Sequence, residues 1–202
     1  MNLFVCSGGQ KRPTYEVLTY LQTGGGQYID TGVSGTSAYG FEVQFSDQTY
    51  SSFDTIISSV KDDFTVALYQ IVKSTYFRKR TVEINIGASV STTEINTIVG
   101  KDGLYVVNGK TVASIDTSVS LASSSRNIYI NTNTSLTRIG SAKYYYLKLY
   151  GSNNTLIRDF IPVIRIDETL GFYDRVNQTF YENDGTGEFI AGAKTGEKIY
   201  LY

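Results

Sequence analysis

The stretch KYYYLKLYGSNNTLIRDFIPVIRIDETLGFYDRVNQTFYENDGTGEFI, residues 143–190, decides the fold of this chain. In its first eight residues, Tyr144, Tyr146 and Lys148 alternate with a second set that contains both leucines, and this is the period of a strand with one buried face. The alternation predicts that one set of side chains points inward, namely Tyr145, Leu147 and Leu149. Gly-Ser-Asn-Asn at 151–154 tolerates the positive φ of a tight turn, and a second apolar run follows at 156–166. The two runs therefore predict a hairpin with long arms.

Three shorter strands are predicted in the rest of this stretch, at 171–176, 179–182 and 188–190. Val-Asn-Gln separates the first two, and Asn-Asp-Gly-Thr-Gly separates the last two. Both separators contain residues that favour turns. Five predicted strands in so short a span leave no room for a helix.

Residues 97–115 predict a three-stranded meander. Asp102-Gly103 and Asn108-Gly109 divide this segment, and such pairs suit a type I′ turn, in which both central residues need a positive φ. A further hairpin is predicted between 56–60 and 64–70, on either side of a charged turn. With no helical period anywhere, the chain is predicted to be all-β, with two antiparallel sheets packed face to face.

Two segments have the composition of edge strands. The run at 77–80, Phe-Arg-Lys-Arg, carries charge that blocks edge-to-edge aggregation, so we predict a solvated edge strand there. The end of the chain, 199–202, is a second candidate. Arg158 is followed by the apolar Phe160 and Pro162, so we expect its charge to form an ion pair or hydrogen bond within the fold.

We expect a single domain over residues 14–202, preceded by an arm at 1–13 that ends at Pro13. Two interpretations of the arm stay open: attachment to a neighbouring subunit, and mobility.

Composition excludes several classes of function. The chain has 202 residues and a formal net charge of −1, so it lacks the basic surface that attracts nucleic acid. It has no histidine, which removes Ser-His-Asp and Cys-His nucleophiles and the usual zinc sites. The single cysteine, Cys6, forbids an internal disulfide. No apolar run reaches the roughly 18–20 residues of a membrane helix, so no membrane insertion is expected, and the first residues lack a secretory-signal pattern.

Seven short motifs occur in order between residue 15 and about residue 192. They are YLQ (20–22), QYIDTG (27–32), GLYVVNGK (103–110), YYLKLY (145–150), LIRDFIP (156–162), GFYD (171–174) and GTG (185–187). Their order and spacing resemble concanavalin A-like, or laminin-G-like, jelly-roll domains of the kind found in phage-encoded and gut-bacterial proteins. The resemblance implies a jelly-roll sandwich. For stand-alone chains of this type it implies a phage virion component such as a tail, baseplate or head-fibre protein, but it brings no defined site with it.

Sugar binding by stacking on exposed aromatic rings is what the resemblance implies for a binding site. The chain has no tryptophan, the usual platform, but tyrosine can replace it with a rigid ring and a hydroxyl group. The candidates, predicted to point away from the core, are Tyr69, Tyr105, Tyr144, Tyr146 and Tyr150. For each of them, packing within the fold or against another subunit is the competing interpretation.

Carboxylates give little sign of catalysis. Retaining glycoside hydrolases need two carboxylates about 5 Å apart, and Glu83-Ile84-Asn85-Ile86-Gly87 supplies only the first of such a pair. We therefore predict no enzymatic activity and no required cofactor. Laminin-G-like domains often bind a calcium ion, and Asp184 and Glu188 are the candidate ligands, although the same loop has the composition of an ordinary turn.

The sequence thus favours a non-enzymatic virion protein that is made in the host cytoplasm and exposed on the phage particle. We expect it to form a homo-oligomer, to contact other virion proteins and to bind host-surface glycans. A structural decoration or spacer domain without a ligand is the first alternative, and a glycoside hydrolase is the second.

Overall fold

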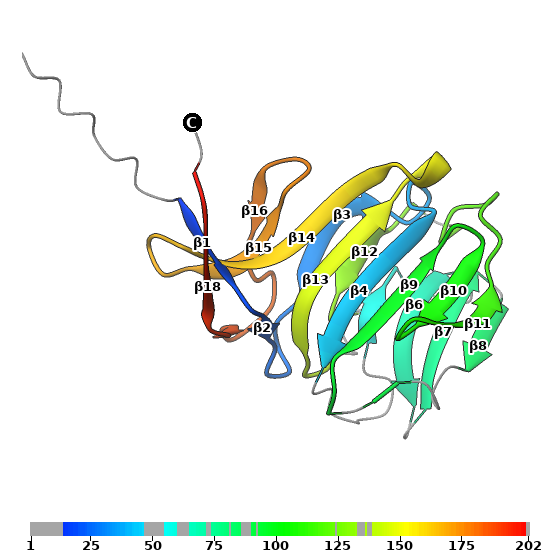
Figure 1. Cartoon of the computed structure of the whole chain (residues 1–202), viewed down its shortest axis with the longest axis horizontal. Helices are drawn as coiled ribbons and strands as arrows, with labels where there is room; N and C mark the ends of the chain where they lie inside the picture. Colours follow the sequence, from blue (N-terminus) through cyan, green and yellow to red (C-terminus); the bar gives the residue numbers. More distant parts are fainter. Residues whose placement is uncertain are drawn as a thin grey trace, which may run out of the picture.

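The hairpin predicted at 143–166 lies in the middle of the larger of two sheets in the computed structural model (Figure 1). β13 spans Lys143–Tyr150 and β14 spans Leu156–Arg165, and the two pair antiparallel. A 3₁₀ turn, Ser152–Asn154, joins them. Asn153 in this turn has a φ of 56°, the left-handed conformation that asparagine tolerates better than most residues.

The structure describes residues 14–46, 55–59, 65–71, 74–80, 82–85, 90–91, 93–123, 125–132, 136 and 139–200. At 65–71, 74–78, 80 and 82 this description covers the backbone. The predicted arm at 1–13 lies outside the described residues.

Ten further strands belong to the larger sheet. They are β1 (Tyr15–Leu18), β2 (Leu21–Gln22), β4 (Gly40–Ser46), β9 (Asn96–Lys101), β10 (Leu104–Val107), β11 (Lys110–Ser114), β15 (Leu170–Asp174), β16 (Thr179–Tyr181), β17 (Ile190–Ala191) and β18 (Lys194–Ile199). The main order is β11-β10-β9-β4-β13-β14-β1-β18, with β15 and β16 attached beside β14, and β2 and β17 attached beside β13.

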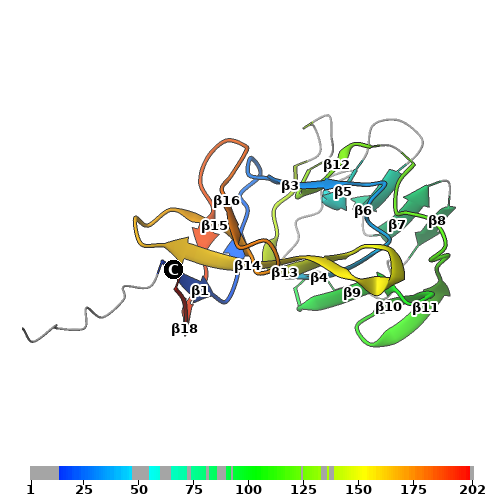
Figure 2. The ribbon, with the colours of Figure 1, turned by 90° about the horizontal axis from the view of Figure 1, so that it is seen from above.

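The second sheet has the order β3-β12-β5-β6-β7-β8. Its strands are β3 (Ile29–Ser34), β5 (Thr55–Ser58), β6 (Thr65–Ile71), β7 (Ser74–Arg80), β8 (Val82–Asn85) and β12 (Asn127–Ile130). Figure 2 shows this sheet as a separate layer over β13, β4 and β9. Every strand pair is antiparallel, and the described residues contain no α-helix, so the predicted all-β fold of two antiparallel sheets is confirmed.

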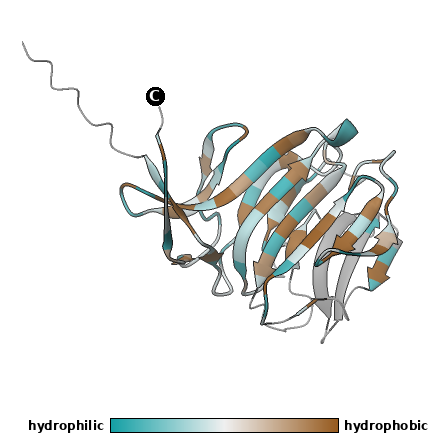
Figure 3. Cartoon of the chain, viewed as in Figure 1, coloured by the Kyte–Doolittle hydropathy of each residue, from teal (hydrophilic) through white to brown (hydrophobic). Residues whose placement is uncertain are grey.

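Side chains from both layers fill one core between the sheets. Hydrophobic and hydrophilic positions alternate along the central strands (Figure 3). The buried members of these strands form the core between the sheets. The larger sheet contributes Phe41, Phe45, Ile98, Leu149 and Phe160, and the second sheet contributes Ile29, Ile56, Ile57, Ile128 and Ile130. Each such side chain stabilises the fold by roughly 1.5–3 kcal/mol through removal of apolar surface from water.

A second, smaller core lies where the two ends of the chain meet. The second half of β14 pairs with β1 and β15, and β1 in turn pairs with β18 (Figure 1). The buried members of this core are Tyr15, Val17, Ile161, Val163 and Tyr173, with Phe180 and Ile199 packed against them. β14 therefore belongs to both cores, because Phe160 faces the main core while Ile161 and Val163 face the small one.

The predicted turns of the meander are confirmed. Asp102 and Gly103 have φ values of 54° and 75°, and Asn108 and Gly109 have values of 49° and 79°. These positive angles are those of a type I′ turn, and they connect β9, β10 and β11 in sequence. The predicted hairpin of β5 and β6 also forms, although its turn lies outside the described residues.

The prediction that the basic run at 77–80 forms a solvated edge strand is wrong. This run is the end of β7, which pairs on one side with β6 and on the other with β8. Lys79 is buried, and its ammonium group donates to the backbone carbonyl of Asp116. An edge strand near the end of the chain is β18, Lys194–Ile199, which shares only Ile199 with the predicted range 199–202. Residues 201–202 lie outside the described residues.

Candidate functional site

A β-bulge in β13 turns two consecutive tyrosines to the outer face of the larger sheet. The register of β13 against β4 shifts between Tyr144 and Tyr146. Tyr144 and Leu147, three positions apart, are therefore both buried at 1% exposure, and the two tyrosines between them point outward. Tyr145 and Tyr146 are each half-buried there.

Because of the bulge, the predicted orientation of Tyr144 is wrong. Tyr144 was expected to point away from the core, but its side chain is buried. Its hydroxyl donates to Oδ1 of Asn131 at 2.9 Å, and Asn131 directly follows β12 in the opposite layer. The prediction assumed that side chains alternate strictly between the two faces. This holds only while each residue of β13 lies opposite one residue of β4. The extra residue in the bulge reverses the phase for everything before it.

Tyr105 is also buried, at 0% exposure, contrary to the prediction that it points outward. It lies in β10, where both sets of alternate residues are apolar, so the sequence pattern could not identify the inner set. In the fold Tyr105 and Val107 face inward, and the Tyr105 ring lies 6.1 Å from that of Phe41. Neither Tyr105 nor Tyr144 can offer a ring to a ligand in this structure.

Tyr146 and Tyr150, the remaining two candidates of the larger sheet, meet at Glu42. The Tyr146 hydroxyl donates to Glu42 Oε1 at 2.7 Å, and the Tyr150 hydroxyl donates to Oε2 at 3.1 Å. Lys148 lies opposite Glu42 in the register of β13 and β4, with its Nζ 3.7 Å from Oε1. The carboxylate thus fixes two tyrosines and a lysine of the neighbouring strand.

The electrostatics of this cluster favour an ionised Glu42 and neutral tyrosines. Partial burial opposes ionisation of Glu42, but the hydrogen bonds from both tyrosines and the charge of Lys148 outweigh it and lower the pKa of its carboxyl group. Burial and the adjacent Glu42 charge raise the pKa values of the Tyr146 and Tyr150 hydroxyls. Both tyrosines therefore remain hydrogen-bond donors at every physiological pH.

Three lysines lie over tyrosine rings on this face. Lys148 Nζ lies 4.9 Å from the centroid of Tyr146, and Lys101 Nζ lies 4.3 Å from that of Tyr150. Beyond the bulge, Lys143 Nζ lies 4.9 Å from the ring of Tyr20. We call the whole set the tyrosine–lysine stripe, and it consists of Tyr20, Glu42, Lys101, Lys143, Tyr145, Tyr146, Lys148 and Tyr150.

The members of the stripe differ in what they expose. Tyr20, Tyr145 and Tyr146 are half-buried and keep part of each ring at the surface. Tyr20 and Tyr145 contact each other at 5.9 Å between centroids, and the Tyr145 hydroxyl hydrogen-bonds Ser46 at 3.0 Å. Tyr150 is only 7% exposed, so its contribution is to hold Glu42. The stripe can therefore offer apolar ring surface beside fixed hydroxyl, carboxylate and ammonium groups.

The other predicted site residues lie elsewhere. Tyr69 is in β6 of the second sheet, opposite Tyr76, and its side chain is outside the description. Asp184 uses Oδ2 to accept the backbone N–H of Asp30 at 2.8 Å, a contact that joins its loop to β3. Glu188 is exposed and lines an open cavity of about 490 Å³ together with other acidic residues.

The structure gives no support for a calcium site at these positions. Asn183 Oδ1 accepts the N–H groups of Tyr28 and Gly185, so the loop is ordered by its own hydrogen bonds. Within the part of the chain that is described, no three acidic, cysteine or histidine side chains are grouped so as to hold a metal ion. Glu83, the residue considered for hydrolysis, is exposed on β8.

Three members of the site were not singled out from sequence. Glu42 was not among the predicted site residues, because nothing local in the sequence reveals that β4 lies beside β13. Tyr145 was assigned to the core, since the bulge was not foreseen. Tyr20 lies just before β2, and only the pairing of β2 with β13 brings it to Tyr145.

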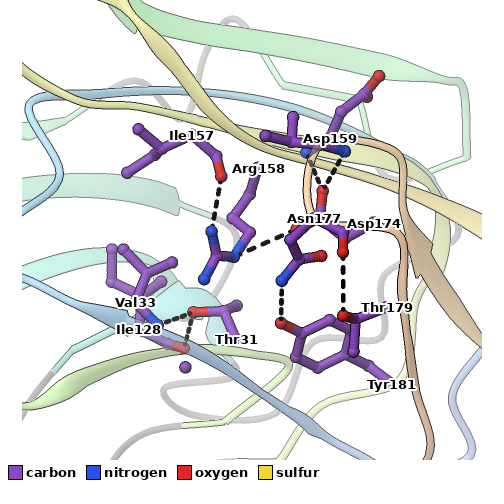
Figure 4. A network of polar contacts seen from close by, with 12 residues as sticks. Thr31, Val33, Ile128, Ile157, Arg158, Asp159, Asp174, Asn177, Thr179 and Tyr181 are labelled. Carbon is purple, nitrogen blue, oxygen red and sulfur yellow. Dashed lines mark hydrogen bonds and ion pairs between the residues drawn. The ribbon is translucent and has the colours of Figure 1, made fainter.

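A buried ion pair fixes β14 and β15 at the rim of the main core, as Figure 4 shows. Asp174 is fully buried, and its Oδ1 accepts the backbone N–H groups of Asp159 and Val176, each at 2.9 Å. Its Oδ2 lies 3.2 Å from Nε of Arg158. The expectation that Arg158 forms an ion pair within the fold is confirmed, and Figure 4 shows its guanidinium pointing toward Thr31 of β3.

Comparison of the sequence with protein-family models gave no match, and comparison with curated proteins gave none either. Among the described residues, no helix has the length and apolar character needed to cross a membrane.

Proposed function

We propose that this chain is a non-enzymatic glycan-binding module of a phage virion, and that the tyrosine–lysine stripe is its binding face. The observation that carries the proposal is the cluster at Glu42, where one carboxylate holds two tyrosine hydroxyls on an outward sheet face. Three tyrosines on this face, Tyr20, Tyr145 and Tyr146, stay partly exposed beside lysines, so part of each ring remains available to a ligand. Rings held in place in this way lose little entropy when a ligand stacks on them.

Each part of the stripe has a role in this proposal. The half-buried rings of Tyr145 and Tyr146 would contact the apolar C–H face of a sugar ring, and Glu42 and Lys148 would hydrogen-bond its hydroxyl groups. Lys148 lies over the Tyr146 ring, so a sugar that stacks there has to displace it. An exposed cation–π contact of this kind is worth about 0.5–1 kcal/mol, which is a small cost for a ligand to meet.

The virion context rests on the resemblance to jelly-roll domains of phage proteins, which the two-sheet antiparallel fold suits. In that context the module would be surface-exposed on the particle, would assemble as a homo-oligomer with other virion proteins, and would bind host-surface glycans. Mass spectrometry of purified phage particles that encode this chain tests the context. Absence of the chain from the particles would remove the virion part of the proposal and leave the binding part intact.

An array of bacterial surface polysaccharides, probed with the purified full chain, tests the binding function. We expect binding to at least one polysaccharide and a loss of about tenfold or more in affinity for Tyr146→Ala, which removes both a ring and the Glu42 hydrogen bond. Tyr200→Ala is the matched control, since Tyr200 is 42% exposed and lies beyond β18, away from the stripe. Equal binding by wild type and Tyr146→Ala would contradict the assignment of the site.

A structural spacer is the second candidate. The lysines over Tyr20 and Tyr146 already cover part of the ring surface, and such a face also suits packing against a neighbouring virion subunit. A chain that binds no polysaccharide on the array but is found in particles, with the stripe covered in an electron-microscopy reconstruction, would establish this alternative.

A further inference from the structure

The stripe is long and narrow because its members come largely from one strand. Lys143, Tyr145, Tyr146, Lys148 and Tyr150 occupy outward positions of β13, an eight-residue strand. At the usual rise of roughly 3.3 Å per residue, the strand spans about 26 Å. Tyr20 extends the aromatic surface at the Lys143 end, and Lys101 of β9 closes the other end over Tyr150.

The flanks of the stripe are polar and ordered. Gln44 lies opposite Tyr146 in the register of β4, and its amide donates to Thr97 Oγ1 of β9 at 3.0 Å. Asp159 of β14 lies opposite Lys148 on the other side. Hydrogen-bonding groups therefore lie beside the rings at several positions along β13, and they are not gathered at one position.

Two recesses of the described residues lie away from this face. The cavity of about 490 Å³ lies at the β14–β15 turn and the loop around Glu188, and a smaller one of about 220 Å³ lies between β1 and the end of β14. Neither is lined by a member of the stripe. A pocket that encloses one terminal sugar buries most of its ligand, whereas an open strand face offers only shallow contacts at each position.

We propose that the stripe binds the interior of a linear polysaccharide, laid along β13, and not a terminal sugar. This inference rests on the proposed glycan-binding function and adds the class of ligand. Successive sugar units contact the three partly exposed rings, Tyr146, Tyr145 and Tyr20, and the polar groups along the strand. Affinity therefore accumulates over several units, and a fragment too short to span from Tyr146 to Tyr20 forfeits part of it.

The test uses the polysaccharide selected on the array, cut by partial acid hydrolysis and separated into fragments of one to six units. In competition against the immobilised polysaccharide, we expect the affinity of free fragments to rise about tenfold or more between two and six units. Tyr20→Ala should reduce the affinity for six-unit fragments about fivefold and leave two-unit fragments within about twofold, because short fragments need only one end of the stripe. Tyr20→Leu provides a second variant that keeps apolar contacts, and urea unfolding of both variants checks that they fold.

The outcomes separate the two claims. If one- or two-unit fragments compete as well as six-unit fragments, or if Tyr20→Ala weakens all lengths equally, the interior-binding inference is overturned while glycan binding stands. If no polysaccharide binds the wild-type chain, the proposed function is overturned, and the inference with it.

Discussion

The outer face of the larger sheet differs between two neighbouring strands, β13 and β14. On β13 it carries the tyrosine–lysine stripe, in which aromatic rings are mixed with charged groups and stay partly exposed. Further along, on the second half of β14, the same face carries Ile161 and Val163, which are buried against Tyr15 and Tyr173. The terminal strands β1 and β18 provide most of the second region's partners, and they do not extend over the first.

The two regions differ in how their aromatic residues are surrounded. The small core also contains tyrosines, with Tyr15 and Tyr173 at 5.0 Å between centroids, but its other members are apolar and it is covered. Its tyrosines stabilise the junction of the two chain ends. In the stripe the rings alternate with lysines around Glu42. These charged groups keep contact with water, so the rings beside them stay partly exposed. We therefore expect substitutions in the small core to change stability, and those in the stripe to change binding.

The largest expected effect is on the ion pair that holds β14 to β15. Asp174→Ala leaves the half-buried Arg158 without its carboxylate and two backbone N–H groups without their acceptor. We expect the free energy of unfolding to fall by about 3–5 kcal/mol. Urea unfolding followed by circular dichroism measures this, and a loss under about 1 kcal/mol would show that the pair does not hold the strands together.

Tyr173→Ala should cost about 3 kcal/mol, since it removes a nearly fully buried ring from the small core. Tyr145→Ala, the matched change in the stripe, should cost about 1 kcal/mol, because its ring is only half-buried. Equal losses in urea unfolding would mean that the two regions do not differ as the comparison requires.

Tyr146→Phe keeps the ring and removes the hydroxyl that donates to Glu42. We expect a loss of about 1 kcal/mol in unfolding free energy, near the value of a partly exposed hydrogen bond. Binding of the array-selected polysaccharide should fall less than for Tyr146→Ala. An affinity as low as that of the alanine variant would assign the interaction to the hydroxyl group and not to the ring.

The smallest expected effect is the pH dependence of Glu42. Its pKa is lowered in the folded state, so its contribution to stability is fully present above the unfolded-state pKa of roughly 4.5 and is lost as the pH falls through the lower folded value. Glu42→Gln should therefore lower stability at pH 7, and its stability should converge toward that of wild type as the pH falls through the folded-state pKa of Glu42. Urea midpoints at several pH values measure the difference, and a gap that stays constant with pH would contradict an ionised, hydrogen-bonded Glu42.

Local features of the fold could be predicted from the sequence. The Asp-Gly and Asn-Gly pairs specify φ angles through two residues alone, so the meander at 97–115 followed directly. The hairpin of β13 and β14 was equally accessible, because a turn of Gly and Asn lies between two apolar runs. In each case the information lies within a few consecutive residues.

The candidate site was less predictable, because it depends on relations between distant strands. The bulge at Tyr145 reverses the phase of Tyr144, and alternation alone cannot locate a bulge. Tyr105 was predicted to point outward and is buried, because both faces of β10 are apolar and the sequence pattern cannot identify the inner one. Tyr146 and Tyr150 were identified as candidates, but their common partner Glu42 lies about a hundred residues earlier and becomes a neighbour only through the order of the strands.

Backbone amide chemical-shift mapping by NMR, with a six-unit fragment of the array-selected polysaccharide added to the full chain, tests the central claim most directly. We predict that the perturbed residues cluster on β13 and on the adjoining residues of β4 and β9, with Tyr145, Tyr146 and Glu42 among the largest shifts. Perturbations confined to the small core, or to the acidic cavity beside Glu188, would contradict the assignment of the stripe as the binding face.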